Sequence, residues 1–545
     1  MGAASNETLS GRRSPEPMKA RMIARAGAVA GALLQGHRAP AIAGAAEHSV
    51  EHPRGLGAIR HERLIVAVCL VLGGLLRSWD LSAIEFKNDE QEALTLGIRL
   101  LDERPWSTDA PWPRTGLASS TSIANPPLFA WIMALFWAAT GDAVRATALV
   151  AFANWLCLFP LYLWARRRIG PERSLMVLAV LCVSPFAVLY SRKLWAQDLL
   201  LPALTLLLWG VEWMRDRGTF WRGIACVVWA ALPISQLHQS GPIVLAVALP
   251  AALVQWIYDR QRGGHSRLGR PTLASMFAIV VGAGAFLFFW VPYLGYVMSL
   301  PPEALTERPR VPMLRAELFR RLLFQLVPRD LVWFFGGDMK YFLSEGHYGS
   351  TALVLRLVGY YGACVTGVLA GAYGLCRWAI SPLALPFVGI WWLGIILAFT
   401  LGRIPSYPHY VLILAPLPAL LISGAFDPSR STRWLRWMRW VRWGHVASLA
   451  LLTTGTLLWV SARGGSSGDY GVTYRIRLEQ ARAIAEDGVA DVRGDRDLAC
   501  GSPHSEIRWL LAHRLGSGAS PKRLHLCEGW RDHGTHREYV WALRR

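Results

Sequence analysis

The residues best suited to chemistry in this 545-residue chain lie in one short stretch, Glu85-Phe86-Lys87-Asn88-Asp89-Glu90-Gln91. It follows directly after the first long apolar run, residues 64–79. Charges beside hydrocarbon are costly, so an acidic pair at such an edge is a candidate functional site. A carboxylate there could take the proton of a hydroxyl group. The alternative is a solvated helix start with Asn88 or Asp89 as its N-cap.

If this stretch is helical, Asp89 and Glu90 point about 100° apart, so at most one of them faces a substrate directly. Other polar residues are expected at the ends of later apolar runs. Each has a structural alternative: a helix cap for Asp198, contacts to lipid head groups for Arg192 and Lys193, or an interfacial position for the histidines. These polar residues are Arg192, Lys193, Gln197, Asp198, Gln236, His238, Gln239, Arg403, Tyr407, His409 and Tyr410.

The composition indicates which elements must position these residues. Hydrophobic residues make up 53% of the chain and 26 residues are Trp, which is typical of a polytopic membrane protein and not of a soluble globule. The net charge of +20 comes mostly from Arg in short loops between apolar runs, where basic residues set membrane orientation. We therefore expect a membrane as partner and no nucleic acid.

Eleven apolar runs are long enough to predict membrane spans. The run Pro126–Thr140 has about fifteen residues and is better sized for an interfacial helix. With that segment at the interface, the basic loops after later spans all become cytoplasmic, the N-terminus lies inside and the C-terminus outside. The eleven runs are 64–79, 146–165, 174–190, 198–214, 219–235, 240–257, 273–298, 351–374, 383–402, 409–425 and 445–462.

This pattern of apolar runs divides the chain into three predicted parts. Residues 1–60 are predicted to be a disordered cytoplasmic extension, although Arg21 and Arg25 before an Ala/Gly run also fit a weak signal peptide. Residues 61–462 form the transmembrane domain, and 463–545 form a small periplasmic α/β domain. In that domain helices are expected at Tyr474–Ala485 and Ser505–Leu515, and strands at 522–527 and 538–543.

Cys500 and Cys527 are the cysteines of this C-terminal domain. Disulfides form and persist in the periplasm, so the two residues are a candidate disulfide. Unpaired thiols in a cytoplasmic tail are the alternative.

The predicted topology places the polar residues on the external side. Carboxylates and cations at that face suit the transfer of a sugar from a polyprenyl phosphate to an acceptor hydroxyl. A carboxylate accepts the hydroxyl proton, and Arg, Lys, His or a metal ion stabilises the leaving phosphate. A transporter or flippase of a lipid-linked or anionic solute is the alternative, but it should show mid-span ionisable groups and internal repeats. A scaffold subunit with a degenerate site is a third interpretation.

Five motifs in this order resemble the GT-C membrane glycosyltransferases, in the branch of protein mannosyltransferases, aminoarabinose transferases and lipopolysaccharide-core galacturonosyltransferases. The similarity covers roughly residues 60–425. The motifs are Asn88-Asp89-Glu90, Asn125-Pro126-Pro127-Leu128, Gly141-Asp142 followed by Arg145, Tyr190-Ser191-Arg192-Lys193 with Asp198, and Pro408-His409-Tyr410 with Pro416.

The resemblance implies an inverting transfer from a polyprenyl-phosphate sugar, with Asp89 as catalytic base and Glu90 beside it. Some members of the family use a divalent metal ion, for which Asp89 and Glu90 would be the ligands. Expected at the donor phosphate are Arg145, Arg192, Lys193, His238, Arg403, His409 and Tyr410, with Asp198 as a further polar site residue. The expected protein is an all-α, multi-pass protein of the bacterial inner membrane with a periplasmic active site. Its acceptor would be an envelope glycolipid or protein.

Overall fold

The computed structural model describes most of the chain, and all structural statements below concern those residues. Residues 1–61 and 62–545 form separate compact units, and of the first unit only the last residues are described. The described ranges are 56–103, 114–118, 123–216, 218–238, 241–263, 270–301, 326–346, 349–380, 386–401, 415–425, 433–486, 499–501, 505–515, 525–532 and 537–544.

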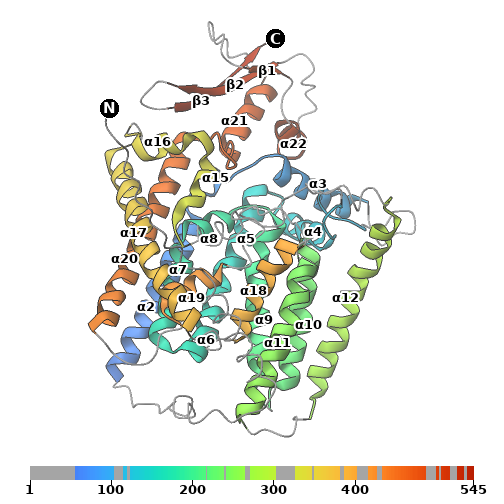
Figure 1. Ribbon diagram of the computed structural model, residues 1–545. Coiled ribbons are helices and arrows are strands. Elements are labelled where there is room, and N and C mark those ends of the chain that lie inside the picture. Colours follow the sequence, from blue (N-terminus) through green and yellow to red (C-terminus); the bar gives the residue numbers. More distant parts are fainter. Residues whose placement is uncertain are drawn as a thin grey trace, which may run out of the picture. The chain divides into compact units, whose positions relative to one another are not determined.

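Helices dominate this part of the chain (Figure 1). The α-helices are α2 (Leu56–Ser78), α3 (Asn88–Asp102), α4 (Leu128–Thr140), α5 (Ala143–Leu156), α6 (Leu158–Ile169), α7 (Pro171–Val183), α8 (Pro185–Tyr190), α9 (Leu200–Trp213), α10 (Phe220–Leu237), α11 (Gly241–Gly263), α12 (Leu273–Ser299), α15 (Leu331–Phe335), α16 (Met339–Ser344), α17 (Ser350–Ile380), α18 (Pro386–Leu401), α19 (Pro416–Ser423), α20 (Arg433–Arg463), α21 (Tyr474–Ala485) and α22 (Ser505–His513). Short 3-10 helices are η1 (Leu81–Ala83), η2 (Ala196–Leu199), η3 (Pro328–Asp330) and η4 (Gly336–Asp338).

Six helical stretches among the described residues are long and apolar enough to cross a membrane. Each coincides to within a few residues with one of the predicted apolar runs or extends beyond it, so the expectation of a multi-pass helical protein is confirmed, while the count of eleven spans stays a prediction. Helix α4 is only 13 residues long, which is short for a span; its interfacial position also stays a prediction. The six stretches are Ala143–Ile169, Phe220–Leu237, Gly241–Tyr258, Leu273–Ser299, Ser350–Ile380 and Arg436–Arg463.

The apolar run 174–190 forms two short helices, α7 and α8, instead of one continuous helix. Pro185 ends α7 because it has no backbone N–H and restricts the residue before it. The carbonyls left open at the end of α7 are satisfied by side chains: the Arg77 guanidinium donates to the carbonyl oxygens of Leu181 and Cys182 at 3.0 and 3.1 Å. Residues 174–183 are all buried, so α7 is a core helix of the bundle.

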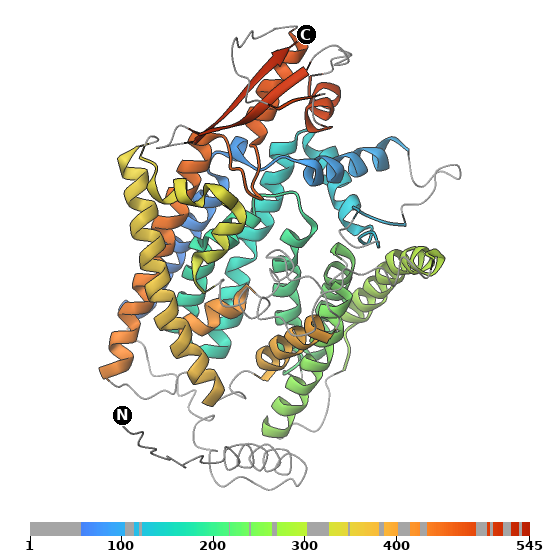
Figure 2. The same cartoon turned by 45° about the horizontal axis from the view of Figure 1, so that its top comes forward.

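Packing pairs the long helices as neighbours: α17 lies against α20, α9 and α12 against α10, and α11 against α18. Figures 1 and 2 show α17 and α20 side by side from both directions, with α3 lying across one end of the bundle. Helix α3 packs on α4. A Cβ atom on Gly97 would lie 2.7 Å from the Ala134 backbone nitrogen, so this crossing requires glycine.

The C-terminal residues contain the expected helices α21 and α22 and three strands, β1 (Ala499–Gly501), β2 (His525–Asp532) and β3 (Arg537–Arg544). The strands form an antiparallel sheet in the order β1-β2-β3. A separate domain of residues 463–545 remains a prediction. At the other end of the chain, α2 begins at Leu56, so the last residues of the predicted 1–60 extension are helical.

Candidate active site

Two buried or half-buried lysines meet at one glutamate between the end of η1 and the start of α3. Lys87 Nζ lies 2.5 Å from Glu85 Oε1, and Lys193 Nζ forms an ion pair with Glu85 Oε2. Asp469 completes the group: its Oδ1 is 3.2 Å from Lys87 Nζ, and its Oδ2 is 3.8 Å from Lys193 Nζ. We call Glu85, Lys87, Lys193 and Asp469 the lysine–carboxylate cluster.

Lysine is rare in this protein, which makes the cluster unusual. The sequence has only five lysines, Lys19, Lys87, Lys193, Lys340 and Lys522, among 57 basic residues. Two of the five therefore share one glutamate. A lysine amine is a compact point charge with three donors, whereas the arginine guanidinium is a wide planar fork. The cluster is thus a place for small anionic oxygens.

The start of α3 separates the two adjacent acidic residues of the motif. Lys87 is extended and acts as N-cap, and its backbone N–H donates to Glu90 Oε2 at 3.1 Å. This bond turns the Glu90 side chain inward, where it is completely buried, while Asp89 on the next face of the helix is exposed. The first turn of a helix favours both carboxylates.

Aromatic rings surround the buried Lys193 amine. Its Nζ lies 4.1 Å from the ring centre of Trp195, 5.1 Å from that of Phe334 and 5.4 Å from that of Tyr190. A desolvated ammonium over aromatic faces is stabilised by the ring quadrupoles. The rings also exclude water, so charges near this lysine interact more strongly than they would in solution.

Asp469 reaches the cluster on a glycine-rich segment, residues 464–473, that follows α20. The segment pairs with the strand-like residues before α3: the Tyr474 N–H donates to the Ile84 carbonyl at 2.9 Å, and the Tyr470 hydroxyl donates to the Ala83 carbonyl at 2.6 Å. Gly465 has φ 128°, and a Cβ there would lie 2.1 Å from the Gly471 carbonyl oxygen. Only glycine fits this turn.

A second buried polar group holds the far side of the same segment. Asp338 accepts from the Ser467 backbone N–H at 2.6 Å and pairs with Arg463 and Arg537, at 3.2 and 3.0 Å. Both arginine–carboxylate pairs and the N–H bond are charge-assisted. Asp338 thus fastens the turn of α20 into the glycine-rich segment, leaving Asp469 directed toward the lysines.

Burial changes the protonation of the carboxylates around Lys193. Burial, together with the charge of Glu85, raises the pKa of Glu90 to about 8. Burial also raises the pKa of Asp198 well above its usual range, with Lys193 opposing the shift. The Asp198 carboxylate oxygens have no hydrogen-bond partner among the described residues, although its backbone carbonyl accepts from Asn154 Nδ2 at 2.8 Å. Both acids therefore favour the neutral form near neutral pH.

The charges of the cluster itself also respond to burial. Burial alone would lower the pKa of Lys87, but Glu85, Glu90 and Asp469 raise it. Lys87 therefore stays protonated, and its amine keeps a positive charge for an anion.

The other predicted site residues that the structure describes divide into three environments. Arg192 is buried, and its Nη2 donates to the carbonyl oxygens of Trp79 and Asp80 at 2.6 and 2.8 Å, which fixes the chain between α2 and η1. Arg145 is exposed in the first turn of α5, where its backbone N–H donates to the Asp142 carboxylate. His238 is buried at the end of α10, and burial lowers its pKa to about 3. The structure therefore brings Lys193, Glu90 and Asp198 together and leaves Arg145 on the surface.

Three predicted phosphate contacts, Arg403, His409 and Tyr410, lie outside the described residues. Cys500 and Cys527 are strand residues whose Cα atoms are direct partners in the β1–β2 register. A disulfide between them stays a prediction.

The predicted metal ligands do not combine into a binding site in the described part of the chain. Asp89 and Glu90 diverge, with Asp89 exposed and Glu90 bonded to the Lys87 N–H. Within the described residues no group of three or more His, Cys, Asp or Glu side chains is arranged to hold a metal ion. The donors here do not fit a divalent cation, because the two lysine amines already neutralise the cluster.

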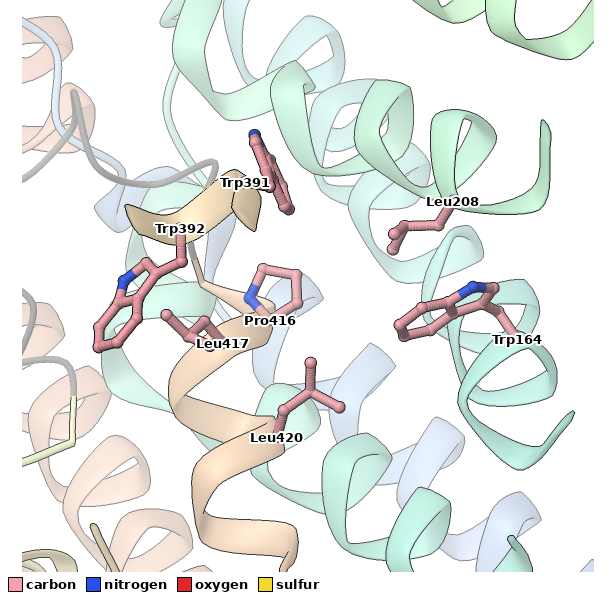
Figure 3. Close-up of a pocket in the computed structure, with 7 residues that line it drawn as sticks. All are labelled: Trp164, Leu208, Trp391, Trp392, Pro416, Leu417 and Leu420. Atoms are coloured by element: carbon pink, nitrogen blue, oxygen red, sulfur yellow. The ribbon is translucent and has the colours of Figure 1, made fainter. Parts of the chain in front are cut away.

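A separate pocket lies between α6, α9, α18 and α19 (Figure 3). Its lining consists of Trp, Leu and Pro side chains, so it supplies no acid, base or cation for proton transfer or phosphate binding. The lining residues are Trp164, Leu208, Trp391, Trp392, Pro416, Leu417 and Leu420.

Sequence reasoning missed Asp469 and gave Glu85 and Lys87 no role. Glu85 and Lys87 lie inside the stretch singled out above, so lysine rarity was an available signal. For Asp469 the only local signal was the glycine run Gly464-Gly465-Ser466-Ser467-Gly468 before it. Such a run marks a special backbone turn and not a partner.

No protein-family model matches the chain, and no curated protein matches it. Solved structures do match. ArnT from Cupriavidus metallidurans in the apo state is 14% identical, with a TM-score of 0.46 over 79% of this chain and 81% of that one. The same protein bound to undecaprenyl phosphate is 15% identical, with a TM-score of 0.43 and the same coverage of 79% and 81%.

A third match is the archaeal oligosaccharyltransferase AglB from Archaeoglobus fulgidus in complex with an inhibitory peptide and a dolichol-phosphate. It is 14% identical, with a TM-score of 0.40 over 80% of this chain and 59% of that one. At these scores the likeness carries no argument about individual residues.

Proposed function

We propose that the protein is an inverting membrane glycosyltransferase. It transfers one hexose or pentose from a polyprenyl-phosphate donor to a hydroxyl of a cell-envelope glycolipid or protein. The observation that carries this proposal is the lysine–carboxylate cluster beside Asp89. Lys87 comes two residues before Asp89, an exposed carboxylate suited to a hydroxyl proton, and Lys87 shares Glu85 with the amine of Lys193, so that two amines suited to a phosphate lie together.

The reaction needs one bond to form and one to break. The acceptor oxygen attacks the anomeric carbon of the sugar, and the bond from that carbon to the phosphate oxygen breaks. The leaving polyprenyl phosphate carries the negative charge that develops, and Lys87 and Lys193 stabilise it. The acceptor proton passes to a carboxylate. A single displacement of this kind inverts the anomeric carbon.

Asp89 is the better base of the acidic pair. Asp89 is exposed two residues after Lys87, whereas Glu90 is completely buried and its Oε2 already accepts the Lys87 N–H. A base must come within hydrogen-bond reach of the acceptor hydroxyl. Glu90 instead holds the N-terminus of α3 in place and is protonated for part of the physiological pH range, given its pKa of about 8.

The cluster belongs on the external side of the membrane. The loop before α3, the link 191–199 and the segment 464–473 all meet there, and the sequence places each of them opposite the Arg-rich loops that are expected inside. We therefore propose a bacterial inner-membrane protein with eleven spans, a periplasmic active site and a periplasmic C-terminal α/β domain. Metal dependence forms no part of this mechanism.

The transporter alternative has less support. A transport site is expected near mid-membrane, at the junction of internal repeats. Here Lys87, Lys193 and Asp469 lie in connecting segments between helices. Charged groups at the ends of spans favour chemistry at the membrane surface.

The test is mass spectrometry of envelope glycolipids and glycoproteins from a strain lacking the gene. We expect one component to lose the mass of a single sugar and the polyprenyl-phosphate sugar to accumulate. The wild-type gene should reverse both changes, and a gene carrying Asp89→Asn should reverse neither. An unchanged envelope, or full reversal by Asp89→Asn, would contradict the proposal.

A further inference from the structure

We propose that Asp469 is an exchangeable counter-ion that occupies the place of the donor phosphate between Lys87 and Lys193 and must move aside for the donor to bind. This inference rests on the proposed function. It assigns a role to a residue that no sequence motif indicated. It also predicts that removal of this carboxylate strengthens binding, which is opposite to the usual effect of deleting a site residue.

The two carboxylates of the cluster differ in accessibility. The Glu85 side chain is 0% exposed and lies against both lysines, so it is a fixed counter-ion. The Asp469 side chain is 22% exposed, and its ion pairs are longer, at 3.2 Å to Lys87 and 3.8 Å to Lys193. An anion arriving from solvent therefore meets Asp469 first and can displace only this partner.

Access to the lysines depends on the same carboxylate. The Lys193 side chain is 1% exposed and is surrounded by Trp195, Tyr190 and Phe334. Lys87 is 28% exposed and also donates to the Asp469 backbone carbonyl at 2.6 Å. Asp469 is thus the polar group through which both amines can be reached together.

Charge balance favours replacement of the Asp469 carboxylate by the donor phosphate over binding of the phosphate beside it. In their usual ionised forms Lys87 and Lys193 carry two positive charges, and their partners Glu85 and Asp469 carry two negative charges. A phosphodiester added to this neutral group would leave a net negative charge in a partly buried site, which is costly. A phosphodiester that replaces Asp469 keeps the group neutral.

The backbone around Asp469 allows the exchange without opening the fold. Asp338 holds the segment at Ser467, and the Asp469 N–H donates to the Trp333 carbonyl at 3.1 Å. These contacts fix the main chain on one side. Rotation of the Asp469 side chain into solvent removes its two ion pairs, while Lys87 keeps its bond to the Asp469 carbonyl and both lysines keep Glu85.

The experiment uses the full-length protein in nanodiscs and measures, by calorimetry at about pH 5, the dissociation constant of farnesyl phosphate, a short polyprenyl phosphate. At this pH the monoester carries about one negative charge, as the phosphodiester donor does, because its second pKa is about 6. We expect Asp469→Asn to bind about fivefold or more tightly than wild type, because a competing ion pair of this exposure is lost. Asp469→Glu keeps the charge and should stay within about twofold. Glu103→Gln removes one exposed negative charge of α3 away from the cluster and controls for net charge.

Unchanged or weaker binding by Asp469→Asn would overturn the exchange. The variants Lys87→Met and Lys193→Met test whether the phosphate binds at this cluster at all. They therefore distinguish failure of the exchange from failure of the proposed function. If these variants lose about tenfold while Asp469→Asn gains nothing, the phosphate binds here but does not replace Asp469. If neither lysine variant changes the affinity, the phosphate does not bind at this cluster and both proposals fail.

A structure of the wild-type protein with farnesyl phosphate provides a test that needs no variant. The phosphate is expected between Lys87 Nζ and Lys193 Nζ, with the Asp469 carboxylate turned away. An Asp469 carboxylate that stays beside both amines while the phosphate is bound would reject the exchange.

Discussion

At the scale of residues, the site depends on the different burial of two adjacent acidic residues. Asp89 and Glu90 are adjacent and equally acidic, yet one is exposed and the other completely buried. The hydrogen bond from the Lys87 N–H to Glu90 decides this, because it fixes the rotation of the first helical turn. Substitutions of Asp89 and of Glu90 should therefore have different effects on turnover.

Asp89→Asn keeps the shape of the side chain and removes the proton acceptor. We expect turnover in a reconstituted transfer assay to fall by about 10² or more, with insertion into the membrane unchanged. Glu90→Gln should lower turnover far less, because the Gln carbonyl can still accept the Lys87 N–H. Near-normal turnover of Asp89→Asn with a large loss in Glu90→Gln would transfer the role of base to Glu90.

Glu90 should also give the protein a measurable pH dependence of stability. Its pKa is raised by burial to about 8 from the model-compound value of 4.5. The folded state therefore binds this proton more tightly than the unfolded chain, so the contribution is present below pH 4.5 and is lost as pH rises through 8. Relative to wild type, Glu90→Gln should gain stability between these values, on the order of 5 kcal/mol at most.

Thermal unfolding of both proteins in nanodiscs at a series of pH values measures this effect. The Tm difference between Glu90→Gln and wild type should grow from pH 5 to pH 9. A difference that does not change with pH would mean that Glu90 titrates normally.

At the scale of elements, the close contact of α3 with α4 positions the acidic pair. Gly97 is the contact point, since any Cβ there meets the backbone of Met133 and Ala134 at 2.7 Å. A larger residue must push α3 away from α4 and shift Asp89 at its other end. The geometry of the site therefore depends on a residue that takes no part in the chemistry.

Gly97→Ala should lower the free energy of unfolding by about 1–2 kcal/mol, because overpacking outweighs the gain in helix propensity. Gly284→Ala in α12 is a matched control, since a Cβ at Gly284 meets no atom within 4 Å. The control should be neutral or slightly stabilising. Thermal unfolding compares the two variants, and equal effects would show that the α3–α4 contact is not tight.

At the scale of the whole molecule, the side of the membrane that each end occupies decides whether a disulfide can form. Cys500 and Cys527 are direct partners in the antiparallel β1–β2 pair. Such partners have Cα atoms about 4.5–5.5 Å apart, within the range that a disulfide requires. A bridge would close a loop of about 27 residues and contribute on the order of 3 kcal/mol in the loop-entropy model.

Thiol labelling of intact cells tests both the disulfide and the side of the membrane on which the C-terminal residues lie. With the outer membrane opened, both cysteines should resist a membrane-impermeant reagent until they are reduced, and then react. In Cys500→Ser, Cys527 should label without reduction. Labelling only after lysis of the inner membrane would place the C-terminus inside and make the number of spans even.

The sequence by itself determined the features that depend on local composition. Apolar runs predicted a helical membrane protein, and α21 has the predicted bounds, Tyr474–Ala485. The alternative of a helix start at Asp89-Glu90 is also correct, although Lys87 and not Asn88 or Asp89 is the N-cap. These features follow from hydrophobic periodicity and capping within a few residues. Composition could not distinguish α7, a core helix, from a lipid-facing span, because both are apolar on all sides.

Only the tertiary structure decided which charged residues meet. Lys87 and Asp469 are 382 residues apart in sequence, and Lys193 comes from a third segment, so no local pattern links them. The same packing buried Glu90, left Asp89 exposed and put Arg145 on the surface. The physical reason is that burial and ion pairing arise from contacts between distant segments, whereas sequence patterns report the preferences of neighbouring residues.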